Sequence, residues 1–169
     1  METTKILEKT HDYRDYTAQN LSKIIKVPAF STTEKERIQL LKKLCEEAGM
    51  EDLWIDGLGS LLGRVGKGSK KLVFDAHIDT VGVGDESQWK TPPFSGLIKD
   101  GLVYGRGASD QLGGAASMIT AAHILKELAY EGDYEIWFSF TTIEEDCDGM
   151  CWKYLIEEEK FIPDFVVST

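Results

Sequence analysis

The sequence predicts an α/β fold in which a mixed sheet is flanked by helices on both faces. Short apolar stretches bounded by turn residues alternate with longer stretches of helical periodicity. No internal repeat or linker divides the 169 residues, so we expect one domain over 1–169. The composition is 42% hydrophobic and 28% charged, as in globular proteins, and no apolar run is long enough to predict a membrane span.

Two helices are expected in the first third of the chain. Residues 5–25 place Tyr13, Thr17, Leu21, Ile24 and Ile25 at helical spacing, and Pro28 follows. Ser31-Thr32-Thr33-Glu34 matches a capping box, which predicts the start of a second helix. The apolar face of that helix comprises Ile38, Leu41, Leu44, Cys45 and Ala48, and Gly49 ends it.

The remaining elements alternate between strand and helix. Strands are expected around 52–56, 60–65, 72–76, 134–140 and 165–167, and a hairpin over 97–104 turns at Asp100-Gly101. Helices are expected over 112–129, which is rich in Ala, Met, Ile and Leu, and over 150–159. Such alternation predicts helices packed on both sides of a sheet.

Three acidic motifs follow segments that are expected to form strands. They are Asp75-Ala76-His77-Ile78-Asp79, Gly105-Arg106-Gly107-Ala108-Ser109-Asp110 and Glu144-Glu145-Asp146. Open α/β sheets expose functional side chains at such strand exits. One imidazole with several carboxylates is the ligand mixture of a hydrolytic two-metal centre.

His77 and Asp79 are the candidates of the first motif. A neutral imidazole can bind a metal while a nearby carboxylate holds its other nitrogen. A lone His-x-Asp pair is common, so the two other motifs carry much of the argument. Glu144 and Glu145 can both face one centre if the backbone turns at the strand end, where one binds metal and the other accepts a proton from water. A solvated acidic turn is the alternative for this pair.

The glycine-containing motif that ends at Asp110 is a poor nucleotide site. The dinucleotide fingerprint requires glycine at its sixth position, where this chain has Asp110, and a carboxylate there repels a pyrophosphate. The glycines instead predict a tight backbone that brings Asp110 into a crowded centre. Its two oxygens could bridge cations about 3.5–4 Å apart.

These motifs together resemble a known family. His77-Ile78-Asp79-Thr80-Val81, the loop from Trp89 to Gly96, the stretch from Asp100 through Asp110, and Glu144-Glu145 resemble the co-catalytic zinc metallopeptidases. That family includes acetylornithine deacetylase, succinyl-diaminopimelate desuccinylase, aminoacylase and glutamate carboxypeptidase. Within it, the stretches 109–114 and 144–152 resemble the subgroup of selenium-metabolism hydrolases.

The resemblance implies a role for each site residue. His77 binds the first of two divalent metal ions, Asp110 bridges both, and Glu145 binds the second. Glu144 is the implied general base, and Asp79 supports His77. Zinc is the implied metal, with cobalt or manganese as alternatives. The implied reaction is amide or peptide hydrolysis, of deacylase or carboxypeptidase type, on a small N-acyl amino acid or peptide. Apart from the resemblance, the open sheet edge after Val167 favours a partner or a homo-oligomer.

The chain also departs from the family pattern. The family places a further acidic ligand after the strand that matches 165–169, a histidine ligand late in the sequence, and an inserted lid domain. Because this sequence ends at Thr169, we expect an amino-terminal part of the catalytic domain with an incomplete site, weak metal affinity and negligible activity. His11 and His123 are expected to be surface or structural residues.

Two other hypotheses about the function stay open. One is a non-catalytic metal-binding or interaction module that keeps half of the fold. Another is a thiol site at Cys147 and Cys151, for which further zinc ligands are missing. The net charge of −10, concentrated in 131–164, disfavours a nucleic-acid partner. Three cysteines and the lack of an apolar leader predict a cytoplasmic protein without a membrane partner.

Overall fold

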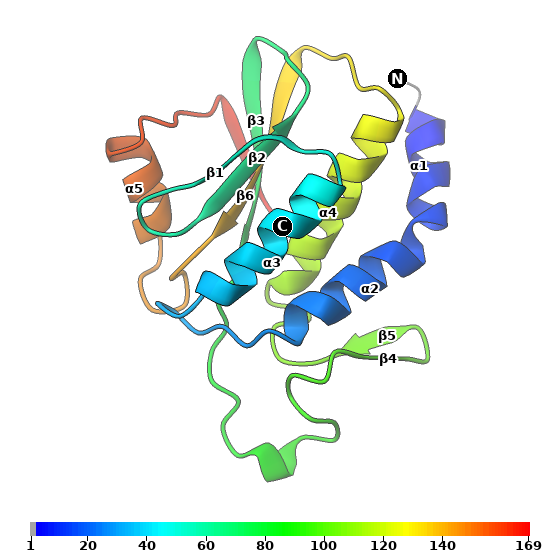
Figure 1. The fold of residues 1–169 in the computed structure, drawn as a ribbon, viewed down its shortest axis with the longest axis vertical. Helices are drawn as coiled ribbons and strands as arrows, with labels where there is room; N and C mark the ends of the chain where they lie inside the picture. Colours follow the sequence, from blue (N-terminus) through cyan, green and yellow to red (C-terminus); the bar gives the residue numbers. More distant parts are fainter. Residues whose placement is uncertain (1–2) are drawn as a thin grey trace.

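A computed structural model describes residues 3–169 (Figure 1). The helices of this part are α1 (Thr3–Asp12), α2 (Arg14–Ile25), α3 (Lys35–Glu47), α4 (Leu112–Glu127) and α5 (Met150–Glu157). The strands are β1 (Glu51–Ile55), β2 (Leu61–Val65), β3 (Lys70–His77), β4 (Leu97–Lys99), β5 (Leu102–Tyr104), β6 (Tyr134–Thr141) and β7 (Phe165–Ser168). A single 3-10 turn, η1 (Glu86–Gln88), lies in the long loop between β3 and β4.

The main sheet is mixed, as the sequence predicts. Its strand order is β1-β2-β6-β3-β7, in which β2 pairs antiparallel with β1 and β6, and β3 pairs parallel with β6 and β7. Strands β4 and β5 form the expected separate hairpin. In the register of the parallel pair, His77 lies opposite Thr141, so β3 and β6 end at the same edge of the sheet.

Helices cover both faces of this sheet, which confirms the predicted fold class. On one face α3 and α4 pack on alternate sheet residues such as Leu61, Ala76 and Phe138, and α2 packs on α4. On the other face Leu155 of α5 packs with residues of the opposite parity, including Val73 and Trp137. Figure 1 shows α5 on one side of the strands and α4 on the other.

The expected helix over 5–25 is wrong in one respect, because the chain forms two helices that meet at Tyr13. Both helices pack on α4, but they contact different parts of it. Lys9 of α1 and Tyr13 bind Glu127 near the end of α4, while Thr17 of α2 contacts Thr120 further toward its middle. The change of direction between α1 and α2 is visible in Figure 1. Tertiary contacts thus interrupt a periodicity that is continuous in the sequence.

The predicted capping box is also wrong. Helix α3 begins at Lys35, and neither Ser31 nor Glu34 makes a side-chain cap hydrogen bond with it. The apolar face of α3 is buried as expected, with Ile38, Leu41 and Leu44 in the core. Both polar side chains of the supposed capping box are engaged by distant segments, as described below.

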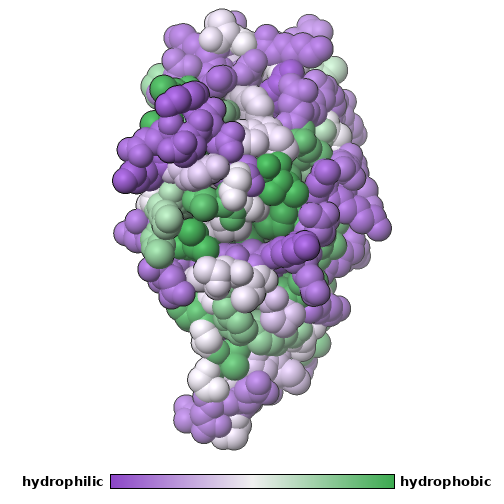
Figure 2. Space-filling model, turned by 60° about the vertical axis from the view of Figure 1, so that its left-hand side comes forward, coloured by the Kyte–Doolittle hydropathy of each residue, from purple (hydrophilic) through white to green (hydrophobic). Residues whose placement is uncertain are grey.

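The surface is a mosaic, with hydrophobic patches among hydrophilic side chains on the face drawn in Figure 2. Phe165, Val166 and Val167 of the edge strand β7 are each about half exposed. An exposed apolar edge strand can pair with another chain, and the predicted homo-oligomer stays a prediction. Within residues 3–169 no helix has the length and hydrophobicity needed to span a bilayer.

Candidate metal centre

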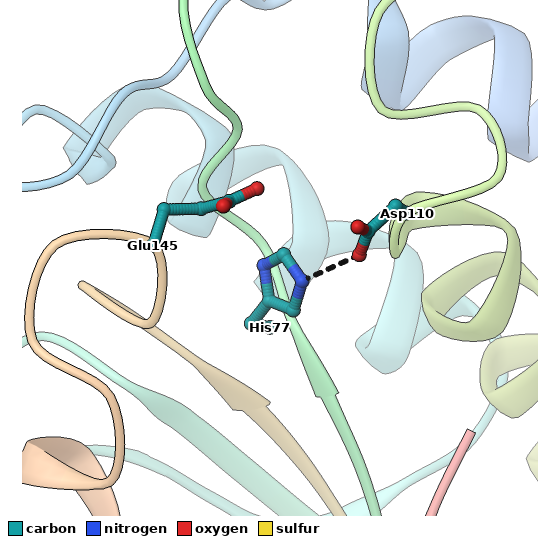
Figure 3. Close-up of side chains that lie close together, drawn as sticks. All are labelled: His77, Asp110 and Glu145. Carbon is teal, nitrogen blue, oxygen red and sulfur yellow. Dashed lines mark hydrogen bonds and ion pairs between the residues drawn. The ribbon is translucent and has the colours of Figure 1, made fainter.

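The three acidic motifs converge at one edge of the sheet. His77 is the last residue of β3, Glu144 and Glu145 follow β6, and Asp110 stands just before α4. Because β3 and β6 are parallel neighbours, their exits lie side by side. Figure 3 shows the side chains of Glu145 and Asp110 on either side of the His77 ring.

The distances support a single centre. His77 Nε2 lies 2.9 Å from Asp110 Oδ1 and 3.8 Å from Glu144 Oε2. One possible ligand atom from each of His77, Asp110 and Glu145 lies within 4.8 Å of the others. The structure therefore brings together all three residues that the sequence predicted as metal ligands, with Glu144 beside them.

The other candidate ligands of the sequence lie outside this group. His123 Nε2 is 3.2 Å from the Tyr13 hydroxyl, its ring packs against Tyr13 and Tyr16, and His11 is exposed on α1. Cys147 is exposed and Cys151 is buried, both as free thiols, and neither belongs to a metal-ligating group of three among residues 3–169. The thiol site thus gains no support.

The His77 ring is buried and oriented through its second nitrogen. Nδ1 lies 3.1 Å from the backbone carbonyl oxygen of Asp79 and 3.5 Å from its carboxylate oxygen Oδ1. A carbonyl oxygen can only accept, so the proton of that hydrogen bond stays on Nδ1 and leaves Nε2 as the nitrogen available to a metal. The main chain of Asp79, rather than its carboxylate, makes the closer contact.

The charges around His77 favour its protonated form. Burial by itself lowers the pKa of His77, but hydrogen bonds with Asp79 and Asp110 and the nearby charge of Glu144 raise it to about 9. Without a metal, the ring is therefore a cation at neutral pH, and its Nε2 proton points at Asp110. A metal that binds at Nε2 has to displace this proton.

Asp79 is buried and fully engaged. Its carboxylate accepts hydrogen bonds from the Ser31 hydroxyl at 2.6 Å and from the backbone N–H groups of Glu144 and Glu145 at 3.2 and 3.1 Å. Burial raises the pKa of Asp79, but the hydrogen bonds from His77, Ser31 and these amides outweigh it and lower the pKa to about 2. Asp79 thus links the histidine to the turn that carries both glutamates.

The loop that carries Asp110 is held by close packing. Gly107 has φ +77°, and a Cβ atom at this position would lie 2.5 Å from Thr80 Cγ2, so glycine is required there. Gln111, joined to Asp110 by a cis peptide bond, accepts the backbone N–H of His77 at 2.9 Å through Oε1. The Asp110 carboxylate itself is 80% exposed and can turn toward an ion.

Three residues of this environment were missed at the level of sequence: Ser31, Glu34 and Gln111. Ser31 binds Asp79, Gln111 binds the end of β3, and Glu34 binds the backbone N–H of Ile143. Ser31 and Glu34 did give a signal, because they match a capping box, but that local pattern contains nothing about partners far away in the sequence.

The residues fit a divalent metal. Imidazole and carboxylate groups are both zinc ligands, and catalytic zinc sites combine three protein ligands with a fourth position for water or substrate. His77 and Glu144 also line a pocket of about 260 Å³ that extends past Asp75 and Thr141 toward Trp152. Burial raises the pKa of Glu144, which brings this carboxylate closer to the range of a general base at neutral pH.

A histidine and carboxylates at the strand exits of a mixed α/β sheet are an arrangement suited to a metal-dependent hydrolase. The family model "Peptidase family M20/M25/M40" matches residues 73–169, which include every site residue discussed above except Ser31 and Glu34. The chain belongs to this family of hydrolases.

The chain is also similar to individual proteins. The chain is 43% identical over 164 residues to the uncharacterized protein YgeY of Escherichia coli K12, an alignment that covers 97% of this chain and 41% of YgeY. It is 32% identical over 131 residues to succinyl-diaminopimelate desuccinylase of Bradyrhizobium, covering 73% of this chain and 34% of the enzyme. The dipeptidase Dug1p of Saccharomyces cerevisiae has the same fold, with a TM-score of 0.82 at 20% identity over 98% of this chain and 40% of Dug1p. The chain thus spans about two fifths or less of the length of these relatives.

Proposed function

We propose that this chain carries the metal centre of a hydrolase that cleaves amide or peptide bonds in small N-acyl amino acids or peptides. The observation that carries the proposal is the convergence of His77, Asp110 and Glu145 within 4.8 Å, with Glu144 at their side. The family membership supports it, and the desuccinylase and dipeptidase among the relatives indicate the class of bond.

His77, Asp110 and Glu145 would hold the metal. We propose zinc, with cobalt or manganese as alternatives, because imidazole and carboxylate ligands suit all three. Three donors suffice for one ion with an open position. The family resemblance implies two ions, for which His77 would hold the first, Glu145 the second, and Asp110 could serve both.

When bound, the metal supplies Lewis acidity that polarises the scissile carbonyl and acidifies water. The chain supplies the proton transfer. Glu144 Oε2 lies at the edge of the centre, 3.8 Å from His77 Nε2, and burial raises the pKa of its carboxyl group. We propose that Glu144 takes the proton from the attacking water and delivers it to the leaving amine. Asp79 keeps His77 and the two glutamates in place.

Zinc titration and hydrolysis assays test this proposal. The 169-residue chain, freed of metal and titrated with Zn²⁺, should bind it, and His77→Ala should weaken binding by at least about tenfold. Dipeptides and N-acyl amino acids, including N-succinyl compounds, are the substrates to assay. We expect at most a trace of hydrolysis from this chain, and Glu144→Gln should remove it while zinc binding is retained.

The three kinds of failure have different meanings. Zinc binding unaffected by His77→Ala would contradict the site. Zinc binding at His77 without turnover on any of these substrates would contradict catalysis by this chain alone. Turnover that survives Glu144→Gln would contradict the role of Glu144 as the base.

A further inference from the structure

The turn that follows β6 is held by side chains from other parts of the chain. Four successive backbone N–H groups, those of residues 142 to 145, donate to buried acceptors. In order, the acceptors are Ser60 Oγ at 3.3 Å, Glu34 Oε1 at 2.9 Å, Asp79 Oδ1 at 3.2 Å and Asp79 Oδ2 at 3.1 Å. The shortest of these hydrogen bonds is the one between Glu34 and Ile143.

Glu34 makes this contact in place of the usual role of an acid at a helix start. It precedes α3 directly, where a carboxylate commonly binds amides of its own helix. Here no side chain caps α3, and Glu34 is only 5% exposed. Its carboxylate reaches a residue 109 positions later in the sequence. The buried Glu34 side chain therefore binds the 142–145 turn and not the start of its own helix.

Ile143 lies two residues past the end of β6. Its φ is +54°, in the left-handed region that a β-branched residue rarely adopts. Such a conformation persists when the surrounding structure holds it. In an extended strand Glu144 and Glu145 would point to opposite faces, so the left-handed residue before them is what allows both to approach His77.

We propose that Glu34 is a positioning residue of the metal centre. By accepting the N–H of Ile143 it holds this residue in its left-handed conformation and so directs Glu144 and Glu145 toward His77. Glu34 acts through the backbone and touches neither metal nor substrate. The inference rests on the proposed metal centre and assigns it a support from outside the segment that the family model matches.

Three substitutions at Glu34 separate the hydrogen bond from charge and size. Glu34→Gln keeps a side-chain oxygen at the same reach, Glu34→Asp keeps the charge but withdraws the carboxylate by one methylene, and Glu34→Ala removes the acceptor. Glu36→Ala is the matched control, because Glu36 is an exposed acid in the first turn of the same helix. Each variant of the 169-residue chain is titrated with Zn²⁺, unfolded thermally without metal, and compared with the wild type by the NMR spectrum of its backbone amides.

Glu34→Ala and Glu34→Asp should weaken zinc binding at least about tenfold, the usual effect of removing a group that orients metal ligands. Glu34→Gln should stay within about threefold of the wild type because the hydrogen bond is kept, and Glu36→Ala should not change binding. A lower unfolding temperature with unchanged zinc affinity would show a merely structural role and overturn the inference. Equal losses in Glu34→Gln and Glu34→Ala would overturn it as well.

The NMR spectrum of the backbone amides tests the positioning role of Glu34 even if zinc binding cannot be measured. If the wild-type chain binds no zinc, the proposed function fails, and the positioning role is judged from the amide signals of Glu144 and Glu145. Movement of these signals in Glu34→Asp, but not in Glu34→Gln or Glu36→Ala, supports the role, and signals that stay in place overturn it. Glu34→Asp also replaces Glu34→Ala if the latter does not fold.

Discussion

The 142–145 turn and the 105–110 loop bring carboxylates to the same histidine by different means. In the turn, Ser60, Glu34 and Asp79 bind four consecutive backbone amides. In the loop, the backbone fits against its neighbours so closely that Gly107 leaves no space for a Cβ atom. Outside this contact, Arg106 stacks on Trp89 and donates to the carbonyl of Gly82.

The two segments should therefore be destabilised by different kinds of substitution. Hydrogen bonds to buried acceptors are lost when an acceptor is removed or protonated, and the unpaired amides are then costly. A packed backbone responds to added volume instead. The difference extends to the side chains, because the Asp110 carboxylate is 80% exposed while that of Glu144 is 38% exposed.

The largest effect is expected at Asp79, on which the turn depends. Asp79→Ala leaves two amides and the Ser31 hydroxyl without their acceptor and removes a charge beside His77. We expect a loss of about 3–5 kcal/mol in the free energy of unfolding, measured with urea. Asp79→Asn keeps one oxygen as an acceptor and should lose less. A loss below about 1 kcal/mol in Asp79→Ala would show that the turn holds itself.

The close packing of the 105–110 loop is tested by adding one methyl group at Gly107. Gly107→Ala combines a left-handed backbone with a clash against Thr80, and we expect it to destabilise the chain by about 1–3 kcal/mol. Gly82→Ala is the control, because a Cβ atom at Gly82 meets nothing within 4 Å. Equal unfolding midpoints for the two variants would contradict a packing-held loop.

The pH dependence of the metal-free chain tests the electrostatics that the two segments share. The pKa of His77 is raised from 6.5 to about 9, so its contribution to stability is complete below pH 6.5 and is lost as the pH rises to about 9. Because Asp110 and Glu144 are partly exposed, we expect only about 1–2 kcal/mol. The measurement is the unfolding free energy at pH 6 and pH 9, in the wild type and in His77→Asn. The same decrease in both would contradict the assignment.

The smallest effect is expected at Arg106. Arg106→Lys keeps the charge but loses the flat guanidinium that lies 5.0 Å from the centre of the Trp89 ring. We expect a loss of about 0.5–1 kcal/mol in unfolding free energy. Trp89→Leu should lose more, because it also removes the hydrogen bond from Trp89 Nε1 to the Val83 carbonyl oxygen at 2.8 Å. The double variant should lose less than the two single losses added together. Full additivity would show that the stacking contributes nothing.

Features that depend on local interactions could be predicted from the sequence, and features that depend on contacts between distant residues could not. The strands and the buried face of α3 were predictable because burial imposes a period that is visible in a few residues. The break at Tyr13 was not, because it depends on where α1 and α2 meet α4. Ser31 and Glu34 were assigned to the wrong partners because a polar side chain that caps a helix and one that binds a distant amide look alike in sequence.

The sequence by itself determined the fold class, the family resemblance and the candidate residues His77, Asp79, Asp110, Glu144 and Glu145. Residue type and strand-exit position are local properties, and they survive without knowledge of the fold. The tertiary structure alone shows that Ser31 binds Asp79, that Glu34 binds the backbone N–H of Ile143, and that Asp79 accepts the amides of Glu144 and Glu145. The physical reason is that a buried acceptor takes whichever backbone amide the fold presents to it, and that amide can lie more than a hundred residues away.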